Sequence, residues 1–388
     1  MHASCAPVRT RAAAAAPLEL ADIVRAHGEP FARSRVLRPE ERATLRAIAQ
    51  CRTAVLGGHL DVCAACGHEQ PSYNSCRNRH CPKCQSLAQA RWVDSRLERL
   101  LPVHYFHVVF TLPAELRAVA CRSREAVFDM LFASAAATLL ALGRDPKLLG
   151  AELGVTMVLH TWTRELLWHP HVHAIVTGGG LSDDGARFVR ARRRFLFPVR
   201  VMGALFRGKM LAALERAQAR GHVDLGEVDL HALRAKPWIV YAKRPFGGPE
   251  QVLRYLGRYT HRVGISNQRL LRCDDRGVTF RTKDGKCVTV DPQELLARFV
   301  QHVLPPRFVK IRHYGLHAAS HATTRLAVAR KRLAPHATPP PRHEREDVAA
   351  LLLRLTGIDL SVCSACHSPA LVRTALPDPR ARAPPAAA

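Results

Sequence analysis

Long hydrophobic runs are missing from this chain of 388 residues. No segment approaches the roughly 18 consecutive apolar residues that a membrane-spanning helix requires, so we expect no contact with a membrane. The N-terminal segment is rich in Ala and Arg and holds no apolar core of the kind found in a secretory signal. We therefore expect a cytoplasmic protein whose N-terminal lead-in is disordered.

Acidic residues are scarce relative to basic residues. The chain holds 32 Asp and Glu against 58 Lys and Arg, which gives a formal net charge of +26. An excess of this size favours a polyanionic partner, and nucleic acid is the first candidate. Richness in Arg and Ala can also follow from GC-rich coding, so charge alone leaves that alternative open.

The cysteine pattern is not that of a small disulfide-linked secreted domain. Six of the twelve cysteines fall in Cys-x-x-Cys pairs within a long basic chain, which favours a reducing compartment and metal binding. Two of these pairs bracket fourteen residues, and four thiolates at this spacing suit one tetrahedral Zn²⁺. We predict a structural zinc with the ligands Cys63, Cys66, Cys81 and Cys84.

Some neighbouring residues remain as alternatives. Cys76, His80 and His59 can replace one of the four ligands, form a second site or support the first. A redox pair or ordinary buried cysteine is the competing interpretation of the motif. The distant pair Cys363 and Cys366, followed by His367, matches a haem-attachment motif by its letters. Because no export signal precedes it, we expect half a zinc site there or no site.

Hydrophobic periodicity predicts an α+β chain without internal repeats. Strands are expected at residues 104–111, 155–163 and 169–177, the last two as a hairpin, and a short antiparallel sheet at residues 269–290. Helices are expected at residues 18–27, 39–50, 86–101, 113–142, 201–221, 249–262 and 292–302. From residue 335 onward the rising Pro, Arg and His content indicates a linker and a disordered tail.

Two histidines in the motif His169-Pro-His-Val-His173 are candidates for a catalytic metal site. A strand alternates its faces, so His171 and His173 project from the same face and can clamp a divalent metal. His160 on the preceding strand or His169 can supply a third ligand, and Glu165 in the turn is a further candidate. The competing interpretation is that these are ordinary surface or core histidines.

Two tyrosines at helical spacing are candidates for nucleophiles. Tyr255 and Tyr259 share one face of the expected helix, and Arg254, Arg258, His261 and Arg262 surround them with positive charge. A tyrosine that attacks a phosphodiester keeps the DNA 5′ end on its oxygen and releases a 3′-OH. Aromatic pairs at this spacing also pack cores, which is the alternative.

Residues 188–200 form a basic segment in which Phe195 and Phe197 are interleaved with arginines. Charge for a nucleic-acid backbone and rings for base stacking favour binding of single-stranded DNA here. The alternative is a solvated loop whose phenylalanines face the core. The residues predicted to bind DNA are Arg192, Arg193, Arg194, Arg258 and Arg262.

Taken together, these motifs resemble the transposases of the insertion sequence ninety-one family, which are rolling-circle, two-tyrosine members of the HUH endonucleases. The resemblance covers roughly residues 50–320. It rests on Tyr73-Asn-Ser-Cys-Arg-Asn-Arg-His-Cys-Pro-Lys-Cys-Gln85, Leu159-His-Thr-Trp162, His169-Pro-His-Val-His173 with the glycines after it, Tyr255-Leu-Gly-Arg-Tyr259, Arg262-Val-Gly-Ile-Ser-Asn267 and Phe308-Val-Lys-Ile-Arg-His-Tyr-Gly315.

The resemblance implies N-terminal helices and a zinc-binding module followed by an HUH-type antiparallel sheet with flanking helices. It also implies a metal, Mg²⁺ or Mn²⁺, at His171 and His173, and nucleophiles at Tyr255 and Tyr259. The corresponding domains are a lead-in at 1–50, a zinc-binding domain at 51–100, a nuclease domain at 101–272, an extension at 273–334 and the tail at 335–388. The short tail departs from the family's pattern.

The predicted function is transposition through metal-dependent cleavage and rejoining of single-stranded DNA, with 5′-phosphotyrosine intermediates. The expected partners are single-stranded element ends and target DNA, together with the host replication machinery, in the nucleoid of a bacterial cell. A plasmid replication initiator or relaxase would use the same chemistry. A non-catalytic zinc DNA-binding protein is the third possibility.

Overall fold

A computed structural model of the chain describes residues 17–97, 99–243, 264–282, 284–334 and 346–377. Helices and antiparallel sheets are mixed, which confirms the predicted α+β class. Chain contacts divide the molecule into two units that alternate along the sequence. The sheet unit comprises residues 92–260 and 304–342, and the cysteine unit comprises residues 1–91, 261–303 and 343–388.

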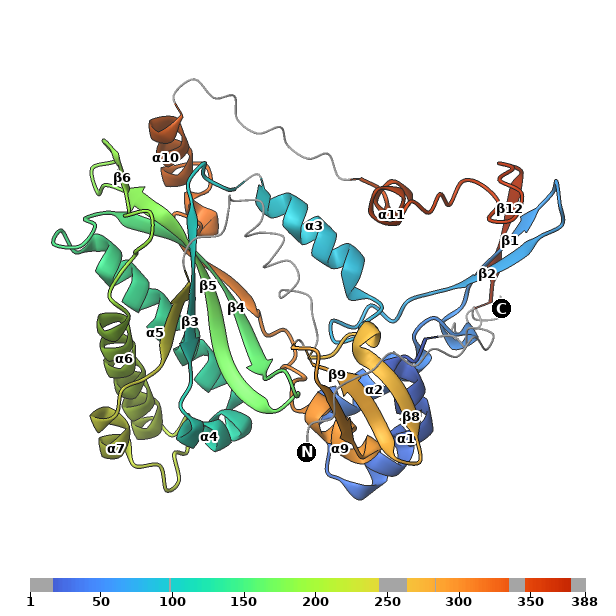
Figure 1. Ribbon diagram of the computed structural model, residues 1–388, viewed down its shortest axis with the longest axis horizontal. Helices are drawn as coiled ribbons and strands as arrows, with labels where there is room; N and C mark the ends of the chain where they lie inside the picture. The colour runs from blue at the N-terminus through green and yellow to red at the C-terminus, as the bar shows by residue number, and fades with distance from the viewer. Residues whose placement is uncertain (1–16, 98, 244–263, 283, 335–345, 378–388) are drawn as a thin grey trace, which may run out of the picture. The chain divides into compact units, whose positions relative to one another are not determined.

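One antiparallel sheet forms the centre of the sheet unit (Figure 1). Its strand order is β11-β4-β5-β3-β7, and β6 pairs with the end of β5. The predicted hairpin is confirmed as β4 and β5, which are longer than expected. The strands are β3 (Tyr105–Thr111), β4 (Glu152–Trp162), β5 (Trp168–Leu181), β6 (Phe188–Arg190), β7 (Val240–Lys243) and β11 (Ile311–Gly315).

The glycines that close β5 allow it to lie against backbone on both sides. A Cβ on Gly179, whose φ is 148°, would lie 2.4 Å from the carbonyl oxygen of Val189 on β6. A Cβ on Gly180 would lie 2.4 Å from the carbonyl oxygen of Glu152 on β4. Only glycine fits such close approaches without moving a neighbouring strand.

Helices cover one face of this sheet, where α5 contacts β4 and β5, and α6 contacts α5 and β7 (Figure 1). The long helix expected at residues 113–142 is divided at Ser123, whose backbone is not helical. The helical elements of the unit are η2 (Ala114–Leu116), α4 (Arg117–Arg122), α5 (Arg124–Arg144), α6 (Val199–Ala219), α7 (Leu230–Ala235), η4 (Ala319–His321) and α10 (Arg325–Leu333).

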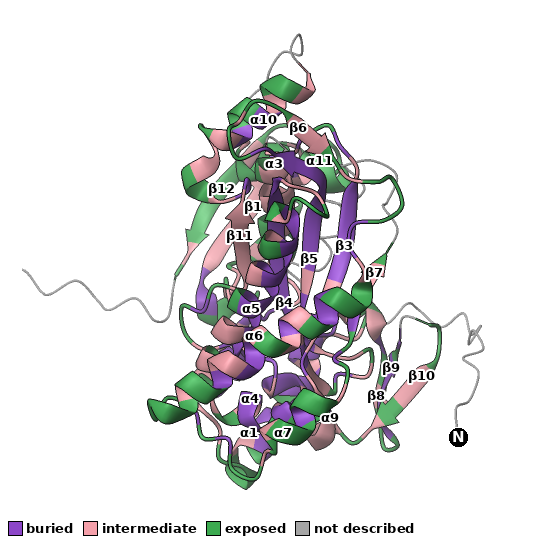
Figure 2. Ribbon diagram, turned by 90° about the vertical axis from the view of Figure 1, so that its left-hand side faces the viewer, coloured by how far each residue is buried: buried purple, intermediate pink, exposed green. Residues whose placement is uncertain are grey.

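The two faces of the sheet bury different side chains. Val155, Met157 and Leu159 of β4 alternate into the large core beneath α5 and α6. The residues between them face the other way, where Val158 and Ile175 belong to a smaller apolar cluster. Figure 2 shows that β3 and β5 are buried over most of their lengths. By length and composition α5 could span a membrane, but 61 % of its most apolar window is buried in this core.

The cysteine unit contains helices and two small three-stranded antiparallel sheets, of order β12-β1-β2 and β10-β9-β8. The second of these is the sheet predicted at residues 269–290, and α2 has the predicted bounds. The elements are α1 (Leu20–Ser34), α2 (Pro39–Gln50), η1 (Ala54–Leu56), β1 (Gly58–Cys63), β2 (Glu69–Tyr73), η3 (Asn267–Arg269), β8 (Leu270–Asp274), β9 (Gly277–Arg281), β10 (Cys287–Val290), α9 (Pro292–Val300), α11 (Val348–Thr356) and β12 (Leu371–Leu376). One more helix, α3 (Gln85–Leu97), runs from this unit into the sheet unit.

The expectation of a disordered tail is wrong for part of residues 335–388. Helix α11 and strand β12 lie in that range, and β12 pairs with β1 from Leu371 opposite Cys63 to Leu376 opposite Gly58. The strand is short and pairs with a segment about 300 residues away, so no local pattern showed that it forms. The serial domains predicted from the sequence also differ from the two interleaved units.

Candidate metal centres

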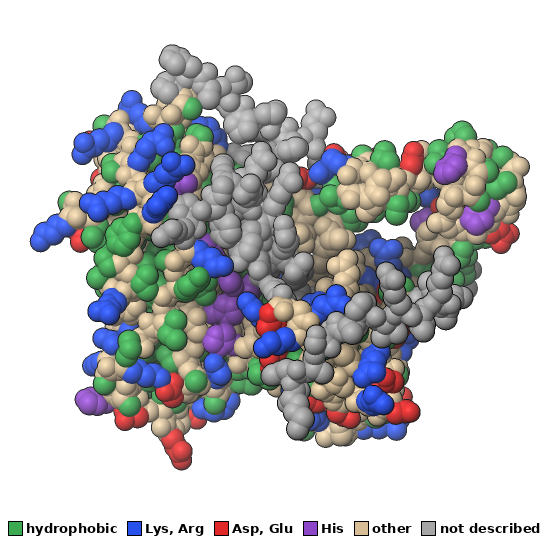
Figure 3. All heavy atoms as spheres, viewed as in Figure 1, with side chains coloured by type: hydrophobic (Ala, Val, Ile, Leu, Met, Phe, Trp, Pro, Cys, Tyr) green, Lys and Arg blue, Asp and Glu red, His purple; other side chains and the backbone are tan. Residues whose placement is uncertain are grey.

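Three imidazoles converge on the face of the central sheet opposite α5. His160 lies on β4, and His171 and His173 lie on β5, where His171 is directly opposite His160. One ring nitrogen from each of the three lies within 4.8 Å of the others. Figure 3 shows histidine side chains gathered on this side of the unit. We call His160, His171 and His173 the histidine triad.

Hydrogen bonds orient two of these rings. Nδ1 of His171 lies 2.7 Å from the carbonyl oxygen of His169, so this nitrogen carries the proton and donates it. Nδ1 of His173 lies 2.7 Å from Nε2 of His107 on β3. Burial lowers the pKa of His107 to about 4, so the neutral ring can accept that bond. His171 and His173 then each have an Nε2 lone pair that can bind a metal.

The distance between these two nitrogens suits a shared cation. Nε2 of His171 and Nε2 of His173 are 3.1 Å apart. Two nitrogens bound to one metal at about 2.1 Å and at right angles would be about 3.0 Å apart. Rings oriented by a second hydrogen bond are the usual arrangement in protein metal sites. The donor set therefore fits a divalent metal.

Neither of the two other candidates for the third ligand converges with His171 and His173 as His160 does. Nδ1 of His169 lies 2.8 Å from the guanidinium of Arg117, which directs this ring to a different partner. Glu165 lies in the turn between β4 and β5 and is not in the group that converges. His107, which sequence reasoning missed, touches the triad from the neighbouring strand. Its signal was the alternation of residues 104–111, which turns His107 and Tyr105 to one face.

The predicted nucleophiles Tyr255 and Tyr259 lie outside the described residues, as do Arg258 and Arg262. In the basic segment, the side chains of Arg192, Arg193 and Arg194 are exposed. The two phenylalanines of that segment differ. Phe195 is 47 % exposed, whereas Phe197 is 2 % exposed and packs into the large core, so only Phe195 is available for stacking.

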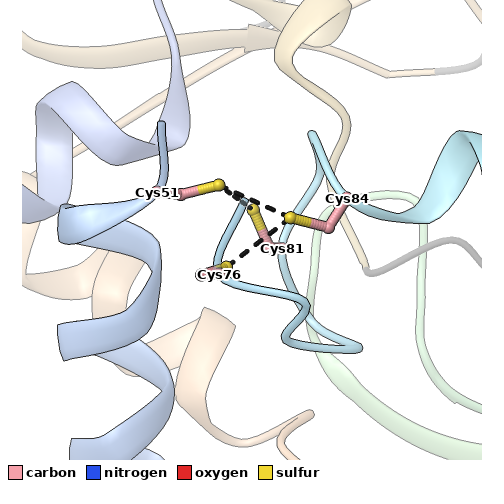
Figure 4. Close-up of side chains that lie close together, drawn as sticks. All are labelled: Cys51, Cys76, Cys81 and Cys84. Carbon is pink, nitrogen blue, oxygen red and sulfur yellow. Dashed lines mark hydrogen bonds between the residues drawn. The ribbon is translucent and has the colours of Figure 1, made fainter. Parts of the chain in front are cut away.

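Eight cysteines form two separate groups of four. In the first group Cys51, at the end of α2, meets Cys76, Cys81 and Cys84 (Figure 4). The Sγ atoms are 3.4 Å apart for Cys51 and Cys84 and 3.6 Å apart for Cys76 and Cys84. Sulfurs at about 2.3 Å from a tetrahedral zinc would be about 3.8 Å apart, whereas a disulfide measures about 2.05 Å.

The second group joins two cysteine pairs that are far apart in the sequence. Cys63 and Cys66 meet Cys363 and Cys366, with Sγ distances of 3.6 Å from Cys63 to Cys366 and 3.8 Å from Cys66 to Cys363. The two pairs form the same turn. The N–H of Cys63 donates to the carbonyl oxygen five residues on, as does that of Cys363, and φ is positive four residues on, at Gly67 and His367.

The predicted ligand set is therefore corrected. Cys63 and Cys66 lie in one group and Cys81 and Cys84 lie in the other, so these four do not surround one ion. Cys76 joins the first group, and neither His80 nor His59 belongs to either group. The sequence identifies the pairs because a Cys-x-x-Cys turn is local. It does not identify which pairs meet, because Cys66 and Cys363 are 297 residues apart.

In the first cysteine group, contacts between the thiols shift their pKa values in opposite directions. Contact with Cys51, then with Cys76, lowers the pKa of Cys84, and contact with Cys51 raises the pKa of Cys81. Without a cation, the four thiols therefore do not all ionise together. A dication would allow all four sulfurs to ionise, which is the state in which cysteines bind zinc.

Comparison with known proteins identifies both regions. Residues 23–112 match the family described as "Transposase zinc-binding domain", and residues 154–325 match the family described as "Putative transposase". The first match and the cysteine groups together support Zn²⁺ as a cofactor. No solved structure matches the chain.

Two relatives match most of the chain. The chain is 44 % identical over 373 residues to "Putative transposase y4qJ" of Sinorhizobium fredii, across 90 % of this chain and 93 % of the relative. It is 30 % identical over 298 residues to "Transposase for insertion sequence element IS801" of Pseudomonas savastanoi pv. phaseolicola, across 72 % of this chain and 70 % of the relative. The chain belongs to the insertion sequence ninety-one family of transposases.

Proposed function

We propose that this transposase cuts and rejoins single-stranded DNA with a divalent metal at the histidine triad and with Tyr255 and Tyr259 as nucleophiles. The observation that carries the proposal is the convergence of three imidazoles, two of which have Nδ1 engaged and Nε2 turned to a common point. Mg²⁺ or Mn²⁺ is the expected metal, because both act on phosphate oxygens.

The chemistry is a transesterification. A tyrosine oxygen forms a bond to the phosphorus, the bond from phosphorus to the 3′ oxygen breaks, and the 3′ oxygen takes up a proton. The DNA 5′ end then remains on the tyrosine as a phosphodiester, so no bond energy is lost and rejoining requires no nucleotide cofactor. The bound metal would polarise a non-bridging oxygen of the phosphate that is attacked.

Two tyrosines permit two strand transfers in sequence. One holds the first 5′ end while the other attacks the next junction, which suits rolling-circle transposition. Exposed Arg192, Arg193 and Arg194, with the ring of Phe195, offer charge and stacking to a single strand at element ends and at the target. Transfer of a free 3′-OH to a polymerase would connect this reaction to the host replication machinery in the bacterial nucleoid.

We further propose two structural zinc ions. One is bound by Cys51, Cys76, Cys81 and Cys84, and the other by Cys63, Cys66, Cys363 and Cys366. Sites made wholly of thiolates leave no open position for substrate, so their contribution is to folding and not to cleavage.

A nicking assay on single-stranded DNA tests the cleavage proposal. With Mg²⁺ or Mn²⁺, DNA carrying the element's ends should be cut and a covalent protein–DNA adduct should form. His171→Ala should abolish both while DNA binding is kept, because binding depends on the wider basic surface. The matched control is His222→Ala, an exposed histidine of the same unit. Cleavage that persists without any divalent metal would refute this mechanism.

A further inference from the structure

A second polar site lies on the same face of the central sheet as the histidine triad. It is a small cavity lined by Arg96, Arg99, Leu100, Tyr105, Thr156, Ile175, His313 and His317. Its volume is about 20 Å³, which is room for one water-sized group. Two arginines and two histidines are among the residues around this small space, although most of the surface that faces it is apolar.

Arg96 lacks hydrogen-bond partners that a buried guanidinium group normally has. Nε and Nη1 of Arg96 are buried and make no hydrogen bond within the described part of the chain. Burial, followed by the charge of Arg99, lowers the pKa of Arg96. Among the ion pairs of the described residues, none joins a carboxylate to Arg96 or Arg99. Buried donors left unsatisfied cost stability, and an anionic oxygen at this position would satisfy them.

One hydroxyl holds both histidines in place. Oγ1 of Thr156 lies 3.0 Å from Nδ1 of His313 and 3.0 Å from Nδ1 of His317. The hydroxyl has one proton, so at least one of these imidazoles donates to it from Nδ1. Burial lowers the pKa of His313 to about 4 and that of His317 to about 3. Both rings are neutral at pH 7, and the positive charge of the site comes from the arginines.

A missing side chain makes room for His317. A Cβ on Gly154 would lie 2.7 Å from Cδ2 and 2.8 Å from Nε2 of that ring. His317 is 6 % exposed, and its Nε2 has no hydrogen-bond partner within the described residues. The sequence therefore keeps a buried polar ring here although an aliphatic side chain would avoid the cost.

The cavity lies along the strands from the triad, and on β5 its residue Ile175 is two residues from His173. Thr156 on β4 is opposite Ile175 on β5, and Val158 on the same face is opposite His173. His313 on β11 is opposite Thr156 and completes the row. Two residues of β-strand span about 7 Å, a distance on the order of one to two nucleotides along a DNA strand.

We propose that this cavity binds a non-bridging oxygen of one phosphate in the DNA strand, within about two nucleotides of the phosphate cut at the histidine triad. The position of the strand rests on the proposed function, whereas the unpaired donors indicate an anion site without it. A cavity of about 20 Å³ is far below the roughly 300 Å³ of a small-molecule pocket, which excludes a nucleotide or metabolite. A single phosphate oxygen fits.

Single-stranded oligonucleotides carrying the element's end, each with one neutral methylphosphonate linkage, test this proposal. Binding is measured without added Mg²⁺ or Mn²⁺, so no cleavage is required. For the wild-type chain, a methylphosphonate at one position of the oligonucleotide should weaken binding about 10- to 100-fold, which is the range expected for the loss of a charged hydrogen bond. In Arg96→Gln, affinity should no longer depend on the position of the methylphosphonate. The magnitude of the slope of log affinity against log salt should fall by about 0.7.

A second variant and a control keep the test decisive. Arg99→Gln changes a second arginine of the same cavity. Tryptophan fluorescence shows whether either variant is folded, because all four tryptophans belong to the sheet unit. Arg216→Gln removes the same charge from an exposed position on α6 and should keep the position dependence. If no position is special in the wild type, or if both cavity variants keep the dependence, the site does not bind phosphate.

The two proposals fail separately. An inactive enzyme that shows the position dependence would refute the cleavage mechanism and leave the phosphate site standing. An active enzyme without the dependence would refute the phosphate site alone.

Discussion

The orientation of single imidazoles determines whether the histidine triad can hold a metal. His173 is held by His107, whose Nε2 lies 2.7 Å from Nδ1 of His173 and whose ring is parallel to it within 7°. His107 itself contributes no atom to the converging group. It is therefore a positioning residue, and its effect should differ from that of a metal ligand.

His107→Ala should weaken metal binding without abolishing cleavage. Loss of a residue that orients a ligand typically costs 10- to 100-fold in metal affinity. The Mn²⁺ concentration for half-maximal nicking should rise by that factor, while the rate at saturating Mn²⁺ stays close to that of the wild type. A loss that saturating metal does not restore would show that His107 only supports the fold.

Tyr255 and Tyr259 carry the most specific prediction about the reaction. Tyr255→Phe and Tyr259→Phe remove only the phenol oxygen, so packing should be unchanged. Each single change should block complete transposition, and the double change should also eliminate the covalent adduct on a denaturing gel. If one of the single variants transposes normally, that ring only packs the structure, and the two-nucleophile mechanism is wrong for this chain.

Among the secondary-structure elements, β12 depends on the most distant contacts. Three interactions attach β12 to the hairpin of β1 and β2. They are the backbone ladder with β1, the ion pair of Arg373 with Asp61, and the adjacent group of Cys63, Cys66, Cys363 and Cys366. Arg373 lowers the pKa of Asp61, so this ion pair persists at neutral pH and weakens only in acid. A metal in this cysteine group would fix the segment before β12 to the end of β1.

Replacing Cys363 and Cys366 together by Ser should reduce the zinc content from about two ions per chain to about one. Residues near β12 should then be cut faster by a protease, because an edge strand that loses its anchor frays. Cys121→Ser is the matched control, since Cys121 lies in neither group. Two zinc ions in the double variant would refute the assignment of Cys363 and Cys366 as ligands.

The same elements show how far the sequence predicts this structure. Strands β3, β4 and β5 were predicted because their alternating apolar residues are a local pattern, and the shared face of His171 and His173 follows from it. The pairing of β12 with β1 and the grouping of Cys51 with Cys84 depend on neighbours in space, which no local pattern contains. His313 and His317 were missed because each becomes polar cavity lining only when β11 pairs with β4.

At the scale of the whole sheet unit, buried neutral histidines make stability depend on pH. Burial lowers the pKa of His107 and His313 to about 4 and that of His317 to about 3, below the ordinary value near 6.5. In the unfolded chain each ring binds a proton as the pH falls through 6.5, whereas the folded chain resists until about pH 4. The contribution of these neutral rings to the free energy of unfolding is therefore fully present above about pH 6.5, and it decreases as the pH falls below that value.

Denaturant unfolding at pH 7.5 and pH 5.5 measures this effect, and tryptophan fluorescence reports the sheet unit alone because all four tryptophans belong to it. Each of the three histidines should cost about 1.4 kcal/mol per pH unit below 6.5. His317→Gln should reduce the dependence without removing it, because other histidines of the unit, among them His104 and His169, also have pKa values lowered by burial. Acid can also release zinc from the other unit, so zinc content is measured at both values. An unfolding free energy that stays constant, or that changes only when zinc is lost, would mean that these rings are not buried in the neutral form.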